Sequence, residues 1–226
     1  DPLLQERLFN PPKPGPSSRP ERSWLGADCA TSLPLPNAST LWLFGDTLVS
    51  GFAGGHRTAA GCAMPHQTVA LQPDRQAPLQ FSWRENKTSG EPLNFFWPQS
   101  SLERAVPCSD PFSETSSYWW VVAGIESSSA NLAPGRLLLL AERVQGTPGQ
   151  GLGFKVLGTS VIVVDNAADN PVQWSHRSAS LTTCGTASCE TWSAGIVPAH
   201  GCGVDCVYLV GSTGPPSSGR GQYLLR

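Results

Sequence analysis

The sequence predicts an all-β protein of the β-propeller class, and three observations support this prediction. The 226 residues are enough for one large domain with a sizeable core. The 23 Gly and 21 Pro are spread along the chain between short apolar runs, which is typical of many strands joined by turns. These runs recur in sets of about 40–50 residues, the length of one propeller blade.

Proline content divides the chain into an arm and a body. Residues 1–22 carry six prolines and predict an extended N-terminal arm, and residues 23–226 predict the propeller domain. A turn at Pro36-Asn37-Ala38-Ser39 would join the first two strands, and Ser50–Gly55 predicts a loop. We expect strands at Ala27–Leu35, Thr40–Phe44, Pro65–Gln72, Leu79–Trp83, Leu93–Trp97, Tyr118–Ile125, Arg136–Val144, Phe154–Asp165, Val172–Ser178, Glu190–Pro198, Val207–Gly211 and Gln222–Leu225.

These strands make about four sets, the last of them incomplete, in a fold of the five-bladed type. An incomplete set leaves an open ring and an unpaired edge, so we expect further polypeptide to close the propeller, in this protein or in another chain. A β-sandwich with a similar number of strands is the alternative.

Charge and hydropathy exclude two classes of partner. The net charge is −2, charged residues make up 14% of the chain, and Lys and Arg do not cluster, so nucleic acid is not an expected partner. The apolar runs are far shorter than the roughly 20 residues that cross a bilayer, so no membrane span is expected.

The seven cysteines predict disulfides and an oxidising compartment. Two close pairs favour local disulfides, and a zinc site that uses all four of these thiols is the alternative. These pairs are Cys184 with Cys189 and Cys202 with Cys206. Cys29 with Cys62 is the third expected pair, which leaves Cys108 free or bonded to another chain.

Two glycosylation sequons, at Asn37 and Asn86, each fall in a predicted turn, where a glycan can be accommodated. Together with the cysteines they predict a secreted or cell-surface glycoprotein.

Two carboxylates carry the functional prediction. Asp28 stands at the start of the first expected strand and Asp46 at the end of the second, so an antiparallel hairpin places both at the same end. Paired carboxylates are what glycoside hydrolysis needs, one to attack or activate water and one to protonate the leaving oxygen. The structural alternative is that both side chains only cap turns and bond backbone amides. Asp110 and Glu126 are candidate third carboxylates, but both lie in Ser-rich segments and are expected to be solvated.

A family resemblance strengthens this interpretation. The runs "WLGADCATSLPL…TLWLFGDTLV", "MPHQTVALQ", "FFWPQ" and "YWWVVAG" resemble the five-bladed β-propeller glycoside hydrolases. The nearest group is the secreted domain family that includes endo-D-arabinanases, with a more distant similarity to arabinanase and β-xylosidase propellers. The resemblance implies that Asp28 and Asp46 are the catalytic pair. The chain departs from the usual Met-Pro-His-Asn-Ser phrase, because Gln67 and Thr68 follow His66.

Four further residues are expected to contact sugar. His66 and Gln67 carry hydrogen-bonding side chains, and His66 could instead orient a carboxylate or lie at the edge of the core. Trp97 and Trp192 could stack on sugar rings or fill the space between blades. Along the strand that contains Trp119 and Trp120, successive side chains alternate faces, so only one of these two indoles can point to the axis.

The sequence therefore predicts a secreted glycoside-hydrolase-like propeller that acts on an extracellular, arabinan-like furanoside, with Asp28 as nucleophile or base and Asp46 as the acid/base partner. It predicts no cofactor and no metal. The alternative is a non-catalytic propeller that serves as a structural or glycan-binding component of a cell-surface assembly.

Overall fold

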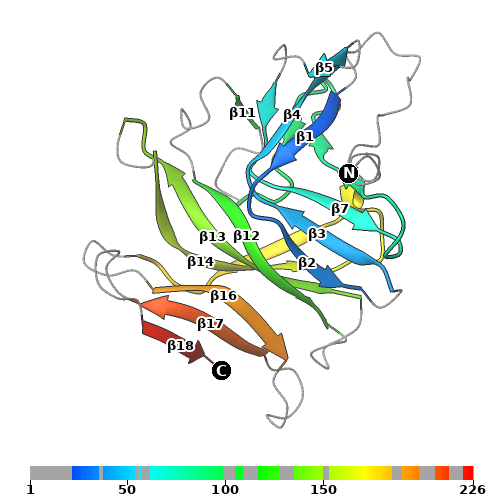
Figure 1. The fold of residues 1–226 in the computed structure, drawn as a ribbon. Coiled ribbons are helices and arrows are strands. Elements are labelled where there is room, and N and C mark those ends of the chain that lie inside the picture. The colour runs from blue at the N-terminus through cyan, green and yellow to red at the C-terminus, as the bar shows by residue number, and fades with distance from the viewer. Residues whose placement is uncertain are drawn as a thin grey trace.

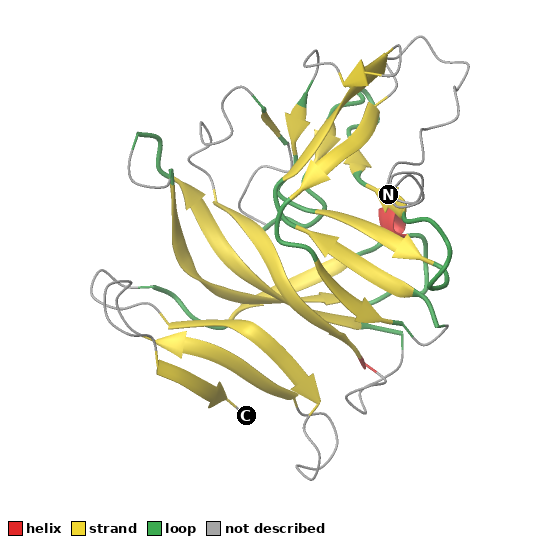
Figure 2. Ribbon diagram, in the orientation of Figure 1, coloured by secondary structure: helices red, strands yellow, loops and turns green. Residues whose placement is uncertain are grey.

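The computed structural model describes residues 22–35, 38–53, 56–57, 62–98, 105–108, 117–127, 135–149, 153–184, 190–198, 207–213 and 221–225. The predicted arm at residues 1–22 lies outside this set except for Arg22. The described part is all-β with antiparallel sheets throughout, which confirms the all-β part of the prediction (Figures 1 and 2). Within these segments, no helix is long and apolar enough to span a membrane.

Three sheets follow one another along the chain, and each is a meander of antiparallel strands. The first contains β2 (Thr31–Pro34), β3 (Thr40–Phe44), β7 (Thr68–Gln72) and β8 (Gln80–Ser82) in that order. The second contains β12 (Ser117–Glu126), β13 (Leu137–Gly146), β14 (Phe154–Val164) and β15 (His176–Ser180), and the third contains β16 (Glu190–Pro198), β17 (Val207–Thr213) and β18 (Gly221–Leu225).

The other described segments form two smaller sheets and one short helix. One sheet runs in the order β1 (Arg22–Ala27), β4 (Thr47–Ala53), β6 (Ala63–Met64) and β11 (Val106–Pro107), with β5 (His56–Arg57) paired to β4. The other pairs β9 (Arg84–Glu85) with β10 (Pro92–Leu93), and the 3-10 helix η2 spans Pro171–Gln173.

Side-chain alternation on β3 explains how the first sheet packs on both faces. Leu41 and Leu43 join the main core, which lies between the first and second sheets. The residues that alternate with them along the strand, Trp42 and Phe44, point to the opposite face and join a smaller cluster with Trp24 of β1. The first sheet is therefore covered on both sides.

The second sheet is likewise packed on both faces. Leu139 of β13 is fully buried against the first sheet, and its neighbour Leu140 is fully buried in a cluster with Trp192 and Leu209 of the third sheet. The initial strand β12 contacts the initial strands of both other sheets, β2 and β16 (Figure 1). The three sheets thus form successive layers, and their initial strands lie near one another.

Three strand predictions and one loop prediction differ from the structure for identifiable reasons. The expected strand Ala27–Leu35 is two strands, β1 and β2, because Cys29 turns the chain with φ +49°. The expected loop from Ser50 is wrong as far as Ala53, because β4 continues there and pairs with β1 and β5. The remaining two are Leu93–Trp97, whose strand ends at Leu93, and Val172–Ser178, which begins as η2 with Asn170 as its N-cap.

Candidate functional site

Asp28 and Asp46 lie side by side at one end of the β2–β3 hairpin. The Asp28 amide donates to the Asp46 carbonyl at 3.1 Å, and the Gly45 amide donates to the Asp28 carbonyl at 3.0 Å. The strands pair antiparallel from Thr31 opposite Leu43, so the start of β2 meets the end of β3. The expected meeting of the two acidic residues at one end of the hairpin is confirmed.

Gly45 makes room for the Asp28 carboxylate. A Cβ atom added at Gly45 would lie 2.5 Å from Asp28 Oδ1, which is closer than packing allows, and 3.1 Å from Cys29 Cβ, which is a tight contact. Any larger residue at this position must displace the carboxylate. The Asp28 side chain is therefore placed by the backbone of the neighbouring strand.

Asp46 is held by two nitrogen donors. Its Oδ1 atom lies 2.8 Å from Nδ1 of His66 and accepts a hydrogen bond of 2.9 Å from Nε1 of Trp120. Its side chain is 14% exposed, so it stays within reach of solvent. These two contacts on one oxygen fix the orientation of the Asp46 carboxylate.

His66 is fixed from three directions. Its ring stacks on Tyr118 with centroids 3.4 Å apart, and its amide donates to Asn94 Oδ1 at 2.8 Å. The third contact is the one with Asp46, so of the alternatives stated above, the structure places this side chain as a group that orients a carboxylate. His66 is 1% exposed, which keeps it beneath the site and away from a ligand in solvent.

Two polar atoms under the site have no hydrogen-bond partner among the described residues. They are Nε2 of His66 and the hydroxyl of Tyr118, whose residues are 1% and 3% exposed. Burial, together with the charges of Asp46 and Asp28, raises the pKa of Tyr118 well above its usual range. The phenol therefore remains protonated and keeps its donor in the neighbourhood of the carboxylates.

The two carboxylates differ in their surroundings. Partial burial is the main cause that raises the pKa of Asp28 above the ordinary value, and the adjacent negative charge of Asp46 adds to it. Backbone and Cys29 hydrogen bonds oppose this rise without cancelling it. Asp28 thus holds a proton more readily than a free aspartic acid does, whereas Oδ1 of Asp46 contacts ring nitrogens of His66 and Trp120.

The other predicted sugar-contacting residues do not join this site. Gln67 is 1% exposed, donates to the Trp119 carbonyl and accepts from the Phe96 amide, so its amide is committed to the core. Trp192 is 8% exposed and packs between the second and third sheets, which is the filler role. Trp97 is half-buried beside His176 and lines a separate groove.

Sequence reasoning missed two members of the site and identified a third only in part. Tyr118 and Trp120 alternate with Trp119 on β12, so both face the Asp46 side while Trp119 enters the main core. Trp119 and Trp120 thus face opposite sides of the strand, as the alternation predicts, and Trp120 is the indole on the Asp46 side. No sequence pattern indicated Asn94, whose side chain accepts a hydrogen bond from the His66 backbone amide.

The predicted cysteine pairing is wrong for the first three cysteines. Cys62 is bonded to Cys108, with Cα atoms 5.6 Å apart, and Cys29 is free and exposed beside Asp28. Pairing of β6 with β11 brings Cys62 and Cys108 together, so Cys108 has no bond left for another chain. Cys184 is also disulfide-bonded, which rules out a zinc site made of all four later thiols. Cys189, Cys202 and Cys206 lie outside the described residues.

The remaining predicted positions divide between surface and core. Asn86 is exposed, and its Oδ1 accepts from the amides of Thr88 and Ser89 in the turn between β9 and β10. Asn37 and Asp110 lie outside the described residues. The expectation that Glu126 is solvated is wrong, because it is 3% exposed and accepts hydrogen bonds from Ser127 and Gly135.

These features define an all-β protein with layered antiparallel sheets and an acidic pair at the end of its first hairpin. The chain belongs to the family described as "Domain of unknown function (DUF5005)", whose model matches residues 18–214. No protein of curated function matches its sequence significantly.

Among solved structures, the chain is similar to a "putative hydrolase" from Bacteroides ovatus ATCC 8483, with a TM-score of 0.54 and 14% sequence identity. The similarity covers 84% of this chain and 48% of that protein, so the chain spans about half of its length. At this identity the similarity concerns the fold.

Proposed function

We propose that the chain is a secreted, glycoside-hydrolase-like β-propeller protein that cleaves an extracellular glycan of the arabinan-like furanoside class. The observation that carries the proposal is the contact between Asp28 and Asp46, with His66 and Trp120 donating to Asp46. The fold of a protein named as a hydrolase agrees with it.

The propeller assignment has support in the order of the sheets. Propeller blades are antiparallel meanders whose initial strands surround a common axis. Here β2, β12 and β16 each begin a meander, and β12 contacts the other two. Asp28 directly follows β1 and is separated from β2 by Cys29 and Ala30, whereas Trp120 belongs to β12, so the acidic pair lies where β12 approaches the first hairpin.

The chemistry assigns the two carboxylates opposite roles, reversed from the prediction made on the sequence. Asp46, oriented by two N–H donors, acts as the nucleophile or base: it attacks the anomeric carbon or takes a proton from the attacking water. Asp28, whose pKa is raised, delivers its proton to the glycosidic oxygen as the C–O bond breaks. The overall reaction consumes one water and releases two glycan fragments.

Location outside the cell is part of the proposal. The Cys62–Cys108 disulfide and the bonded Cys184 fit an oxidising compartment. Asn86 is exposed in a turn and is accessible for glycosylation. The proposed partner is a carbohydrate. A further polypeptide that completes the propeller is also part of the proposal.

Hydrolysis assays on arabinan, xylan and an aryl arabinofuranoside test the proposal. We expect Asp46→Asn to abolish activity on all substrates. Asp28→Asn should lose about 10²–10⁴-fold on the polymers and less on the aryl glycoside, whose leaving group needs little protonation. Asp165→Asn, an exposed carboxylate paired with two arginines, is the control. A folded wild-type protein that cleaves none of these substrates would instead support a non-catalytic, glycan-binding component of a cell-surface assembly.

A further inference from the structure

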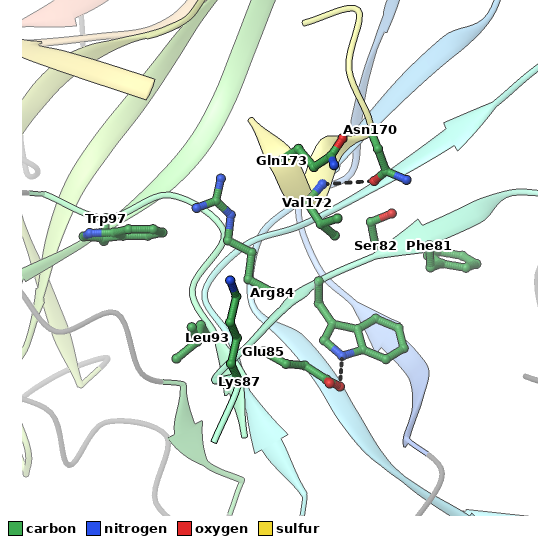
Figure 3. Close-up of a pocket in the computed structure, with 11 residues that line it drawn as sticks. Phe81, Ser82, Arg84, Glu85, Lys87, Leu93, Trp97, Asn170, Val172 and Gln173 are labelled. Atoms are coloured by element: carbon green, nitrogen blue, oxygen red, sulfur yellow. Dashed lines mark hydrogen bonds between the residues drawn. The ribbon is translucent and has the colours of Figure 1, made fainter. Parts of the chain in front are cut away.

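A second candidate site lies at the outer edge of the first sheet. An open groove of about 820 Å³ runs between the β8 to β10 segment and the helix η2 (Figure 3). Its volume falls in the range of about 300–1,000 Å³ that is typical of ligand sites. The lining residues used below are Trp83, Arg84, Lys87, Trp97, Val172 and Gln173.

The groove is separate from the acidic pair. Asp28 adjoins β2, whereas the groove adjoins β8, and these strands are opposite edges of the same four-stranded sheet. Two strands lie between them, so three spacings of about 4.8 Å separate the edges by about 14 Å. No residue that contacts Asp46 lines the groove.

Several side chains of the groove are held in place before any ligand binds. Trp83 donates its indole N–H to Glu85 at 2.9 Å, which satisfies the polar edge of the ring. The Arg84 guanidinium lies 5.0 Å from the centroid of the Trp97 ring and 5.2 Å from that of Phe95, and it donates to the Trp174 carbonyl. Because these groups are fixed, a ligand that packs on them loses little further side-chain entropy.

Other groups of the groove are open to solvent. Val172 is 46% exposed, which is high for a large apolar residue, and it adjoins Asn170 and Gln173 in Figure 3. Gln173 and Lys87 are exposed, and their side chains make no hydrogen bond or ion pair with the described residues. Rigid indoles with neighbouring amide and ammonium donors suit a ligand that presents both C–H faces and hydroxyl groups.

We infer that this groove is a second glycan-binding site, which takes a segment of an oligosaccharide chain on Trp83 and Trp97 and hydrogen-bonds it through Gln173 and Lys87. The open shape suits a chain that passes through the groove and continues beyond it. The inference rests on the proposed function only in taking a glycan as the ligand, and it needs no catalysis. The groove holds a polymer on the protein, away from the acidic pair.

Affinity electrophoresis in native gels that contain soluble arabinan, xylan, arabinoxylan or polygalacturonate tests the inference. All samples carry Asp28→Asn and Asp46→Asn to prevent cleavage, and Thr88→Ala to remove the Asn86 sequon while the Asn86 turn is kept. Trp83→Ala and Gln173→Ala are compared with Trp42→Ala. Trp42 is a matched control. It is half-buried on β3 of the first sheet, its indole N–H donates to Gln72, and it does not line the groove.

We expect retardation by at least one polysaccharide, with a Kd raised about tenfold by Trp83→Ala or Gln173→Ala and unchanged by Trp42→Ala. A Kd that is unchanged in both groove variants, or the absence of retardation in all four gels, overturns the inference. Hydrolysis by the protein with both carboxylates intact is scored separately, so failure of the catalytic proposal is distinguishable from failure of the groove.

Discussion

Trp120 donates its indole N–H to Oδ1 of Asp46 at 2.9 Å, across 74 positions of the chain. The bond joins the initial strand of the second sheet to the end of the first hairpin. The acidic pair is therefore not a property of the hairpin alone, because its orientation depends on how two sheets pack.

Replacing this donor tests whether it orients Asp46. Trp120→Phe keeps a ring against Phe154 but removes the N–H, and we expect glycan hydrolysis to fall about 10- to 100-fold, since a hydrogen bond to a charged group contributes about 1.5–3 kcal/mol. Trp119→Phe is the matched control, because that indole N–H has no partner among the described residues. Equal losses in kcat for the two variants would contradict the orienting role.

The close approach of Gly45 to Asp28 gives a second prediction. Gly45→Ala places a methyl group 2.5 Å from the carboxylate oxygen and must move it, and misplacement by about 1 Å costs on the order of 10²-fold in rate. Gly26→Ala is the control, because nothing lies within 4 Å of a Cβ at that position. Steady-state kinetics of both variants, with melting temperatures, checks this. Full activity in Gly45→Ala would show that the carboxylate position does not matter.

The proximity of the two acidic residues could be predicted from the sequence, because it needs only a short hairpin with well-marked strands. The Cys62–Cys108 bond could not. It depends on the pairing of β6 with β11, each two residues long, and two residues carry no hydrophobic period. The failure of Gln67 and Trp192 as ligand contacts has a similar cause, since a polar or aromatic side chain looks the same in sequence whether it faces solvent or the core.

The pKa of Asp28 makes stability depend on pH. The pKa is raised in the folded protein, so folding favours the protonated carboxyl, and this contribution is full below the ordinary value of 3.8. It is lost as the pH rises through the folded pKa. We therefore expect Asp28→Asn to raise the melting temperature at pH 7 and to leave it nearly unchanged at pH 3. A lower melting temperature at pH 7 would mean that the ionised carboxylate stabilises the fold.

The reactivity of the Cys29 thiol depends on the charge of Asp28. Cys29 is an exposed residue with a free thiol. Partial burial of the thiol is the main cause that raises its pKa above the ordinary 9.0, and the Asp28 charge adds to it. Alkylation at pH 8 should therefore be slow. Asp28→Asn removes that charge, so the pKa of the Cys29 thiol should fall and the labelling rate at pH 8 should increase. Iodoacetamide labelling followed by intact mass spectrometry measures the rate. The opposite ranking of the two proteins would contradict the proximity of thiol and carboxylate.

The Cys62–Cys108 disulfide closes a segment with a sequence separation of 46 and ties β6 to β11. In the chain-entropy description, a loop of this length stabilises the folded state by about 4 kcal/mol, and removal of native disulfides typically costs about 2–5 kcal/mol. We expect the double variant Cys62→Ser and Cys108→Ser to lose stability in this range by urea denaturation. Cys29→Ser removes a thiol that forms no bond, so its midpoint should stay close to that of the wild type. If the Cys29 change were the more destabilising one, Cys29 would have to be paired in solution, and the free thiol beside Asp28 would not exist.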